Sequence, residues 1–365
     1  MVLPFPGAVP VTAYAAAFAM AGLSSLSLTV FVRHRARVAG LFDWQEGSGG
    51  RGGRFARPRV DVPRAGIPRV GGVAVTIAVL ATMCAAAPWL MVRRPGWGAG
   101  GSGLAVLLAG GVGMHLVGLA DDFRPLAARW KFALQVGVAL LVCGAGVRLT
   151  TLQLPGFGLV HVGVALSTVL TVAWLVGMTN ALNLIDGLDG LASGAALFAL
   201  AALFIFARAN GRPDAALMSI ALAGATLGFL RFNFYPATIF LGDSGSLFLG
   251  FMLGGVGLLS TQAAASAAPT AMACAVPIVV LGLPLLDTSL AVARRLAQRR
   301  PIFSGDRAHI HHRLLDRLLA RGHSPRTAVL ALYALCAVFA LCGMWLVADA
   351  APAAPRSIEA AAGPR

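Results

Sequence analysis

Long apolar segments recur along the whole sequence, and they constrain the fold more than any other feature. A helix that crosses a membrane needs about 20 apolar residues, and about ten segments approach this length. The sequence therefore predicts an all-α integral membrane protein with about ten transmembrane helices. We expect residues 1–348 to form a single membrane domain and residues 349–365 to form a disordered tail. The expected spans are residues 9–32, 70–92, 103–119, 132–147, 159–178, 191–207, 215–230, 247–260, 271–292 and 327–347.

The composition excludes several other classes of protein. Only 12% of the 365 residues are charged, and the mean hydropathy is +0.80. A soluble domain carries about 25% charged residues, so an ordinary soluble enzyme, a disordered chain and a coiled coil do not fit. The five cysteines fall inside expected spans and lack metal-ligand spacing. We therefore expect reduced packing residues rather than a disulfide scaffold.

Basic residues gather in alternate loops, and this pattern indicates an orientation in the membrane. Loops rich in Lys and Arg stay on the cytoplasmic side. The sequence thus predicts that both termini lie outside and that the basic loops lie inside. There the net charge of +15 can also attract anionic lipid or a phosphorylated substrate. Most of the 29 lysines and arginines fall in the loops at residues 33–69, 120–131, 179–190, 231–246 and 293–326.

Aspartates cluster in three of these inside loops, although the loops are far apart in the sequence. A carboxylate at a membrane boundary is costly and is a functional candidate by default. Carboxylates, together with water and substrate phosphates, are the ligands that Mg²⁺ prefers. We therefore expect the acids to converge on one active site in the cytoplasmic loops. They are Asp121, Asp122, Asp186, Asp189 and Asp243.

The first acidic loop combines Asp121 and Asp122 with Lys131, the only lysine in the chain. An aspartate pair alone is a weak signal, because a solvated helix end explains many such pairs. Lys131 either extends its ammonium to the membrane surface or binds a phosphate as a compact point charge.

The second loop repeats a polar residue every three positions, at Asn183, Asp186 and Asp189. In a helix or a 3₁₀ turn this spacing places the three side chains on one face. A polar helix cap is the plain alternative, and the spacing does not match an EF-hand calcium loop.

The third loop places Asp243 before an apolar span, with Ser244 or Ser246 as the expected N-cap. The helix N-terminus then offers free amides to a phosphate, and Asp243 either holds a metal beside it or merely caps the helix.

The last inside loop contains His309, His311 and His312, followed by Arg313. Such a run can bind zinc, but no Cys or Glu stands near it in the sequence and arginines flank it. These cations favour an anion, so we expect a contact with a sugar nucleotide or a diphosphate. We expect His115, inside an apolar span, to be structural.

In their order along the chain, these motifs resemble the polyprenyl-phosphate N-acetylhexosamine-1-phosphate transferase family. The resemblance runs from Pro68-Arg69-Val70-Gly71-Gly72 through the acidic loops to His309–Arg313. The His-x-His-His-Arg form resembles the branch that transfers GlcNAc-1-phosphate. One departure is the absence of the histidine that the family commonly carries shortly before Pro-Arg-x-Gly-Gly.

The resemblance implies an enzyme of the bacterial inner membrane. In the implied reaction, undecaprenyl phosphate attacks the β-phosphorus of a UDP-sugar and UMP leaves. Mg²⁺, or alternatively Mn²⁺, would bind Asp243 with Asn183 as the second ligand. Asp121 or Asp122 would accept the proton, or in an older alternative Asp122 or Asp243 would be a nucleophile. Substrate-binding roles are implied for Arg69, Lys131, Asn180, Asp186, Asp189, Asn233, Phe240, His309, His311, His312 and Arg313.

Within the substrate-binding set, the resemblance implies that Phe240 stacks on the uracil. It also allows a homodimer, and it gives no reason to expect a nucleic-acid partner.

Other functions stay open at this stage. The sugar can differ, as in a phospho-MurNAc-pentapeptide translocase or another UDP-hexosamine transferase. A secondary transporter would place ionisable residues near the middle of the membrane, whereas here Asp287 is the only acid that falls inside an expected span. A CDP-alcohol phosphatidyltransferase needs a motif that is absent. A lipid-binding scaffold would not need the clustered aspartates.

Overall fold

The computed structural model describes residues 9–40, 66–93, 97–154, 158–261, 275–298 and 309–349. The expected tail beyond residue 349 and most of the loop at 33–69 lie outside the described residues. The cysteines that are described, Cys84, Cys143, Cys336 and Cys342, are free thiols, as expected.

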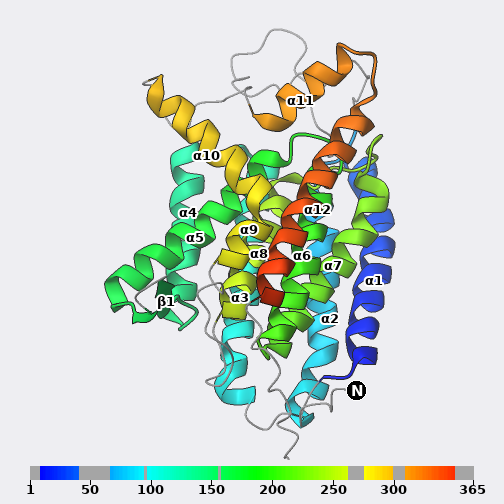
Figure 1. Ribbon diagram of the computed structural model, residues 1–365. Coiled ribbons are helices and arrows are strands. Elements are labelled where there is room, and N and C mark those ends of the chain that lie inside the picture. Colours follow the sequence, from blue (N-terminus) through cyan, green and yellow to red (C-terminus); the bar gives the residue numbers. More distant parts are fainter. Residues whose placement is uncertain are drawn as a thin grey trace, which may run out of the picture.

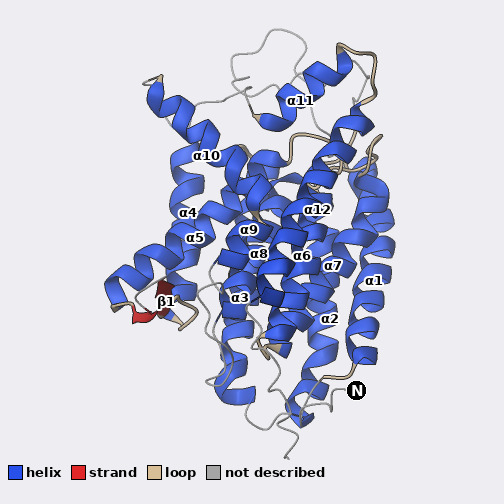
Figure 2. Cartoon of the chain, viewed as in Figure 1, coloured by secondary structure: helices blue, strands red, loops and turns tan. Residues whose placement is uncertain are grey.

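Helices account for nearly all of the described residues (Figures 1 and 2). They are α1 (Val11–Val38), α2 (Gly71–Arg93), α3 (Trp97–Phe123), α4 (Ala128–Gly144), α5 (Val164–Ile185), α6 (Leu191–Ala209), α7 (Pro213–Asn233), α8 (Gly242–Thr261), α9 (Ala275–Val280), α10 (Gly282–Ala297), α11 (Ile310–Leu319) and α12 (Pro325–Asp349). Strands β1 (Thr151–Leu154) and β2 (Gly158–His161) pair antiparallel, with Thr151 opposite His161.

Seven of the described helices are long and apolar enough to cross a membrane: α1, α3, α5, α6, α7, α8 and α12. In α2, a shorter apolar stretch covers Gly71–Ala87. The fold is therefore that of an all-α integral membrane protein, apart from the β1–β2 hairpin, and the count of ten spans stays a prediction.

Two of the expected spans differ from the structure. The span expected at residues 159–178 begins later, at Val164, because Gly158–His161 forms strand β2. In the described part of the span expected at 271–292, α9 ends at Val280 and α10 begins at Gly282. Pro284 explains this break, because it has no N–H to donate to the carbonyl of Val280.

Helix α8 forms the centre of the bundle and is buried over almost its whole length. It packs against α3, α5, α6 and α2. The helices around it expose large apolar side chains, such as Phe31 of α1, Leu141 of α4 and Trp345 of α12. This distribution suits a bundle whose outer surface faces lipid, because lipid tails solvate apolar side chains as well as a protein core does.

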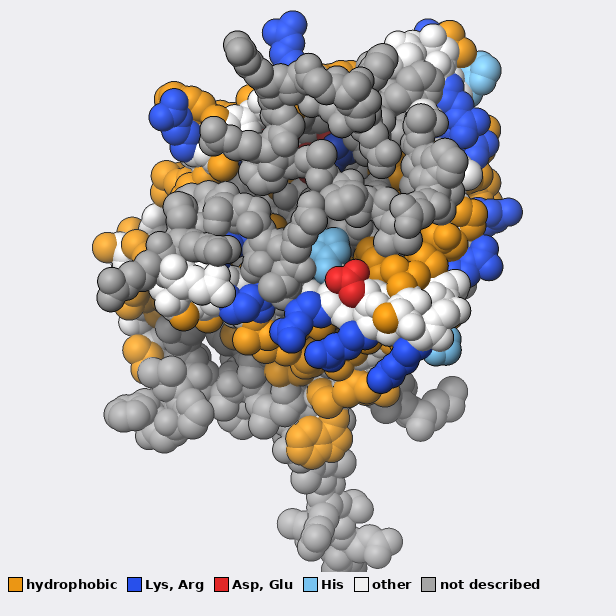
Figure 3. All heavy atoms as spheres, turned by 90° about the horizontal axis from the view of Figure 1, so that it is seen from above, with side chains coloured by type: hydrophobic (Ala, Val, Ile, Leu, Met, Phe, Trp, Pro, Cys, Tyr) orange, Lys and Arg blue, Asp and Glu red, His pale blue; other side chains and the backbone are white. Residues whose placement is uncertain are grey.

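Different elements mark the two ends of the bundle. Helix α11 lies at one end, and the β1–β2 hairpin lies toward the other (Figures 1 and 2). A view onto the α11 end shows Lys and Arg side chains spread around it (Figure 3). The loops that carry the aspartates and histidines meet at this same end, as the contacts below show.

Candidate active site

A backbone pairing fixes the position of α8 at the α11 end of the bundle. Phe240 N–H donates to the carbonyl of Pro68 (2.8 Å), and Gly71 N–H donates to the carbonyl of Phe240 (3.0 Å). Gly72 N–H donates to the carbonyl of Leu241 (2.9 Å). A Cβ on Gly72 would collide with the backbone of Gly245, so only glycine permits this approach. The Pro-Arg-x-Gly-Gly motif therefore has a structural role, because it holds the start of α8 against α2.

The carboxylate of Asp122 caps α8 from the neighbouring helix α3. Its Oδ1 accepts the amide of Asp243 (2.8 Å) and its Oδ2 accepts the amide of Ser244 (2.9 Å). The expectation that Ser244 or Ser246 is the N-cap is wrong, because α8 begins at Gly242 and both serines lie inside its first turns. Two of the amides that we expected to meet a phosphate, those of Asp243 and Ser244, are thus already satisfied by Asp122.

Close packing of α3 against α8 makes this cap geometrically available. Gly118 lies one turn before Asp122, and a Cβ there would collide with the backbone of Asp243. The buried ring of His115 lies near the same turn of α8, with Nδ1 3.2 Å from the carbonyl oxygen of Ser244. His115 is therefore structural, as expected.

Asp121, Lys131 and Asp243 form a half-buried charged group beside this cap. Lys131 Nζ donates to Asp121 Oδ2 (3.0 Å) and to Asp243 Oδ2. Burial lowers the pKa of Lys131, but the carboxylates of Asp243 and Asp121 outweigh burial and raise that pKa above its usual value. Lys131 therefore stays protonated and neutralises part of the charge of the two acids.

Asn183 completes this group from α5. Its Nδ2 donates to Asp243 Oδ1 (3.0 Å) and to Ser246 Oγ (2.8 Å), and Ser246 Oγ donates to the carbonyl of Gly242 (3.0 Å). The side chain of Asp243 is thus held between Asn183 and Lys131. In this arrangement Asn183 orients Asp243 through its amide nitrogen, and its amide oxygen is the atom that would bind a metal.

The donors of this group fit a magnesium ion. Asp121 and Asp243 bring two carboxylates around one cationic group, and hard oxygen donors of this kind suit Mg²⁺. These two residues would hold the ion, with Asn183 orienting Asp243.

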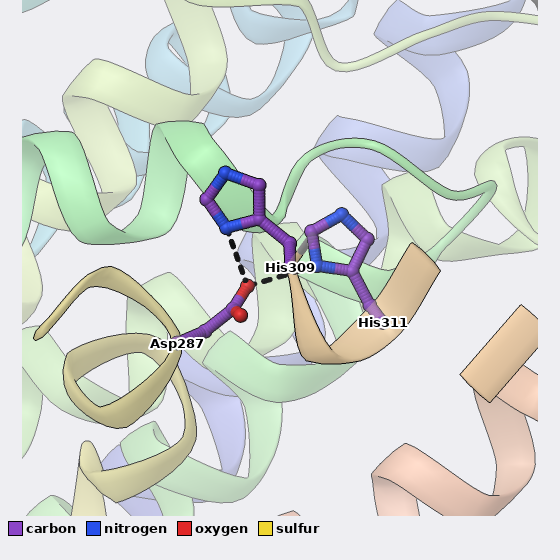
Figure 4. A group of neighbouring side chains, drawn as sticks. All are labelled: Asp287, His309 and His311. Carbon is purple, nitrogen blue, oxygen red and sulfur yellow. Dashed lines mark hydrogen bonds and ion pairs between the residues drawn. The ribbon is translucent and has the colours of Figure 1, made fainter. Parts of the chain in front are cut away.

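A second polar group lies at the junction of α10 and α11 (Figure 4). The imidazole rings of His309 and His311 both turn toward the carboxylate of Asp287. Asp287 Oδ2 lies 3.2 Å from His309 Nδ1 and 2.9 Å from His311 Nδ1, while Asp287 Oδ1 accepts the amide of Ile310 (2.7 Å). All three side chains are buried. Sequence reasoning did not include Asp287 in the site, although an acid inside an apolar span was a usable signal.

The C-terminal end of α5 lies between the two groups. Asn183 contacts Asp243, whereas a Cβ on Gly187 would lie 2.8 Å from His311 Nε2. Asp186 is the C-cap of α5, between these two contacts. His312 is half-buried, with its ring centre 4.3 Å from that of His311, and Arg313 is exposed. The structure therefore brings the acidic loops and the histidine run together at one end of the bundle.

Several other residues with an implied substrate role make contacts within the protein. Asn233 accepts from Ser193 Oγ (2.9 Å) and donates to the carbonyl of Ile239 (3.1 Å). Asp189 accepts the amide of Ala237 (3.0 Å). Phe240 is only 4% exposed, so in this structure its ring has no open face for uracil stacking.

Asn180 makes a similar contact on α5. Its Nδ2 donates to Gln135 Oε1 (2.6 Å), which joins α5 to α4. Roles in holding the fold therefore fit Asn180, Asp189, Asn233 and Phe240 in this structure, and their contact with a substrate stays a prediction.

A polytopic helical bundle with a charged group at the helix ends defines an integral membrane protein with a site suited to phosphate chemistry. The model of glycosyl transferase family 4 matches residues 104–261, which include Asp121, Asp122, Lys131, Asn183 and Asp243. The chain belongs to this family.

The relatives support the same assignment. A Bacillus subtilis protein named "probable undecaprenyl-phosphate N-acetylglucosaminyl 1-phosphate transferase" is 35% identical over 275 residues, which cover 75% of this chain and 72% of the relative. The decaprenyl-phosphate N-acetylglucosaminephosphotransferase of Mycolicibacterium smegmatis is 38% identical over 336 residues, which cover 86% of this chain and 78% of the relative. The phospho-N-acetylmuramoyl-pentapeptide-transferase of Geobacillus kaustophilus is 30% identical over 305 residues, which cover 79% of this chain and 86% of the relative.

Proposed function

We propose that this protein transfers GlcNAc-1-phosphate from UDP-GlcNAc to a polyprenyl phosphate, most simply undecaprenyl phosphate. The products are a lipid diphosphate sugar and UMP. The observation that carries the proposal is the group of Asp121, Lys131, Asn183 and Asp243, gathered from four helices at one end of the bundle. The names of the Bacillus subtilis and Mycolicibacterium smegmatis relatives support the sugar and the polyprenyl-phosphate acceptor.

The chemistry requires charge neutralisation and alignment more than covalent assistance. An oxygen of the lipid phosphate forms a bond to the β-phosphorus, and the bond from this phosphorus to the UMP oxygen breaks. A phosphate monoester with a second pKa of about 6 is mostly dianionic at neutral pH, so little proton abstraction is needed. Bound Mg²⁺ would neutralise charge on the diphosphate.

The two aspartates of the first loop have different roles in this proposal. Asp121 accepts Lys131 Nζ on Oδ2 (3.0 Å) and the amide of Leu126 on Oδ1 (2.6 Å), so it is placed beside Lys131 to orient the lipid phosphate. Asp122 uses both of its oxygens on the amides of α8, so it positions Asp243 rather than acting as a base or a nucleophile.

The orientation in the membrane is also part of the proposal. We place the charged end of the bundle on the cytoplasmic side of a bacterial inner membrane, with both termini outside. The Lys and Arg side chains around the α11 end support this placement, because basic residues favour the cytoplasmic side (Figure 3). A UDP-sugar donor is present in the cytoplasm, so with this orientation the site would face the compartment that contains its donor.

The test is a UMP-release assay with purified protein, Mg²⁺ and undecaprenyl phosphate. UDP-GlcNAc and UDP-MurNAc-pentapeptide are offered separately, because the Geobacillus relative makes the second sugar the main alternative. We expect UMP only with UDP-GlcNAc. We also expect UMP release to be lost in Asp243→Asn but kept in Asp214→Asn. The carboxylate of Asp214 pairs with Arg212 at the start of α7, the end opposite to Asn233. No UMP with either donor would reject the proposal and favour a transporter.

A further inference from the structure

The carboxylate of Asp287 and the rings of His309 and His311 form a compact group of potential metal ligands. One atom from each residue lies within 4.8 Å of the others. Zinc binds imidazole nitrogen at about 2.0–2.1 Å and carboxylate oxygen at about 2.0–2.2 Å, so tetrahedral ligand atoms lie about 3.3 Å apart. The separations of 3.2 Å and 2.9 Å from Asp287 Oδ2 to the two Nδ1 atoms are close to this spacing.

The surroundings hold these ligands in place. His309 is extended and is the N-cap of α11, so the chain turns into the helix between the two rings. The second oxygen of Asp287 accepts the amide of Ile310 (2.7 Å), which fixes the carboxylate plane. Asp287, His309 and His311 are 1%, 4% and 2% exposed, respectively. Supporting hydrogen bonds and a buried shell of this kind are typical of protein metal sites.

The chemistry of these donors differs from that of the group of Asp121, Lys131, Asn183 and Asp243, which we call the acidic group. Two imidazoles and one carboxylate suit zinc and related transition metals, whereas Asp121 and Asp243 offer the oxygen donors that suit magnesium. The sequence argued against zinc because no Cys or Glu stands near the histidines and arginines flank them. The fold supplies a carboxylate ligand from α10, 22 residues before His309.

We propose that Asp287, His309 and His311 bind a divalent transition metal of the zinc class, separate from the catalytic Mg²⁺ site. The metal joins α10 to the start of α11 and leaves a coordination position for water or a phosphate oxygen, as three-ligand zinc sites do. To bind it, each imidazole presents the Nδ1 lone pair and carries its proton on Nε2. This proposal does not depend on which sugar the enzyme transfers.

The test measures metal bound by untagged, full-length protein in detergent. The protein is stripped with EDTA, loaded with Zn²⁺, desalted and analysed by elemental mass spectrometry. We expect about one zinc per chain for the wild type. Co²⁺ loading of the stripped protein is expected to give the visible absorption of a four- or five-coordinate ion.

Matched variants separate this site from the others. Asp287→Ala and His311→Ala are expected to lose the bound zinc, whereas His323→Ala, in the exposed turn after α11, keeps it. Asp243→Ala is expected to lose UMP release and keep the zinc. The wild-type melting temperature is measured with and without Zn²⁺, and a rise on loading supports a folded-state site without any variant.

Two results would overturn the zinc site. One is zinc uptake by the wild type no greater than that of His311→Ala. The other is zinc that disappears in Asp243→Ala, which would place the metal at the acidic group instead.

Discussion

Asp122 holds the backbone of Asp243, while its neighbour Asp121 shares Lys131 with the side chain of Asp243. Two adjacent aspartates thus act on one residue in different ways. One fixes the position of the main chain, and the other shapes the charge around the carboxylate.

This division predicts different outcomes for the two aspartates. Asp122→Ala removes the cap of α8, so we expect a loss of about 1 kcal/mol in stability together with low activity. Asp121→Asn keeps the fold and loses activity, because it removes a charge beside Lys131. Melting temperature and UMP release, measured on both variants, check this. Equal melting temperatures with equal residual activities would contradict the assignment.

Lys131 predicts a pH dependence of stability. Its raised pKa means that its ion pairs stabilise the fold fully below its unfolded pKa of about 10.4, and that this contribution is lost as the pH rises through the higher folded pKa. Relative to Lys131→Met, we therefore expect a wild-type advantage of about 1 kcal/mol that is constant from neutral pH to about pH 9. It declines only in strongly alkaline buffer. Unfolding midpoints of both proteins across this range are the measurement, and an advantage that fades near neutral pH would refute the prediction.

A substitution of Asn183 tests whether this residue orients Asp243 or binds the metal directly. Because its amide nitrogen contacts Asp243, we expect Asn183→Ala to lower kcat by about 10- to 100-fold while the Mg²⁺ concentration for half-maximal rate changes little. Magnesium titrations of wild type and variant decide the matter. A large rise in the required Mg²⁺ would instead support the direct ligand that the family resemblance implies.

Gly72 is predicted to be intolerant of a side chain. A Cβ there meets the backbone of Gly245, so Gly72→Ala should displace α8 and cost about 1–3 kcal/mol, with a loss of activity. Gly137 in α4 is the matched control, because a Cβ there has no atom within 4 Å. Gly137→Ala should be neutral or slightly stabilising. Equal melting temperatures of Gly72→Ala and Gly137→Ala would show that the close approach of α2 to α8 does not contribute to stability.

The main features of the fold could be predicted from the sequence because apolar length and loop charge are local signals. They gave most of the helices, and they placed the acidic loops at one end. The break between α9 and α10 also had a local signal in Pro284, but hydropathy alone predicts one continuous span across it.

The roles of individual side chains could not be predicted in the same way. Nothing local distinguishes Asp121 from Asp122, because the difference arises where α3 meets α8, more than 100 residues later. The same applies to Asp287, whose partners His309 and His311 lie at the start of another helix, α11. The structure places Asn183 against Asp243, but the atom that makes the contact depends on packing against Ser246, and the role of Asn183 as a metal ligand stays a prediction.

The ion pair of Asp121 and Lys131 also has a consequence for biogenesis. The two residues belong to consecutive helices, so their ion pair needs only α3 and α4 to have been inserted. Asp243 enters with α8, after α5, α6 and α7 have been made. Asp243, which Asp122 and Lys131 both contact, therefore joins the site late in insertion, when most of the helices that enclose it are present.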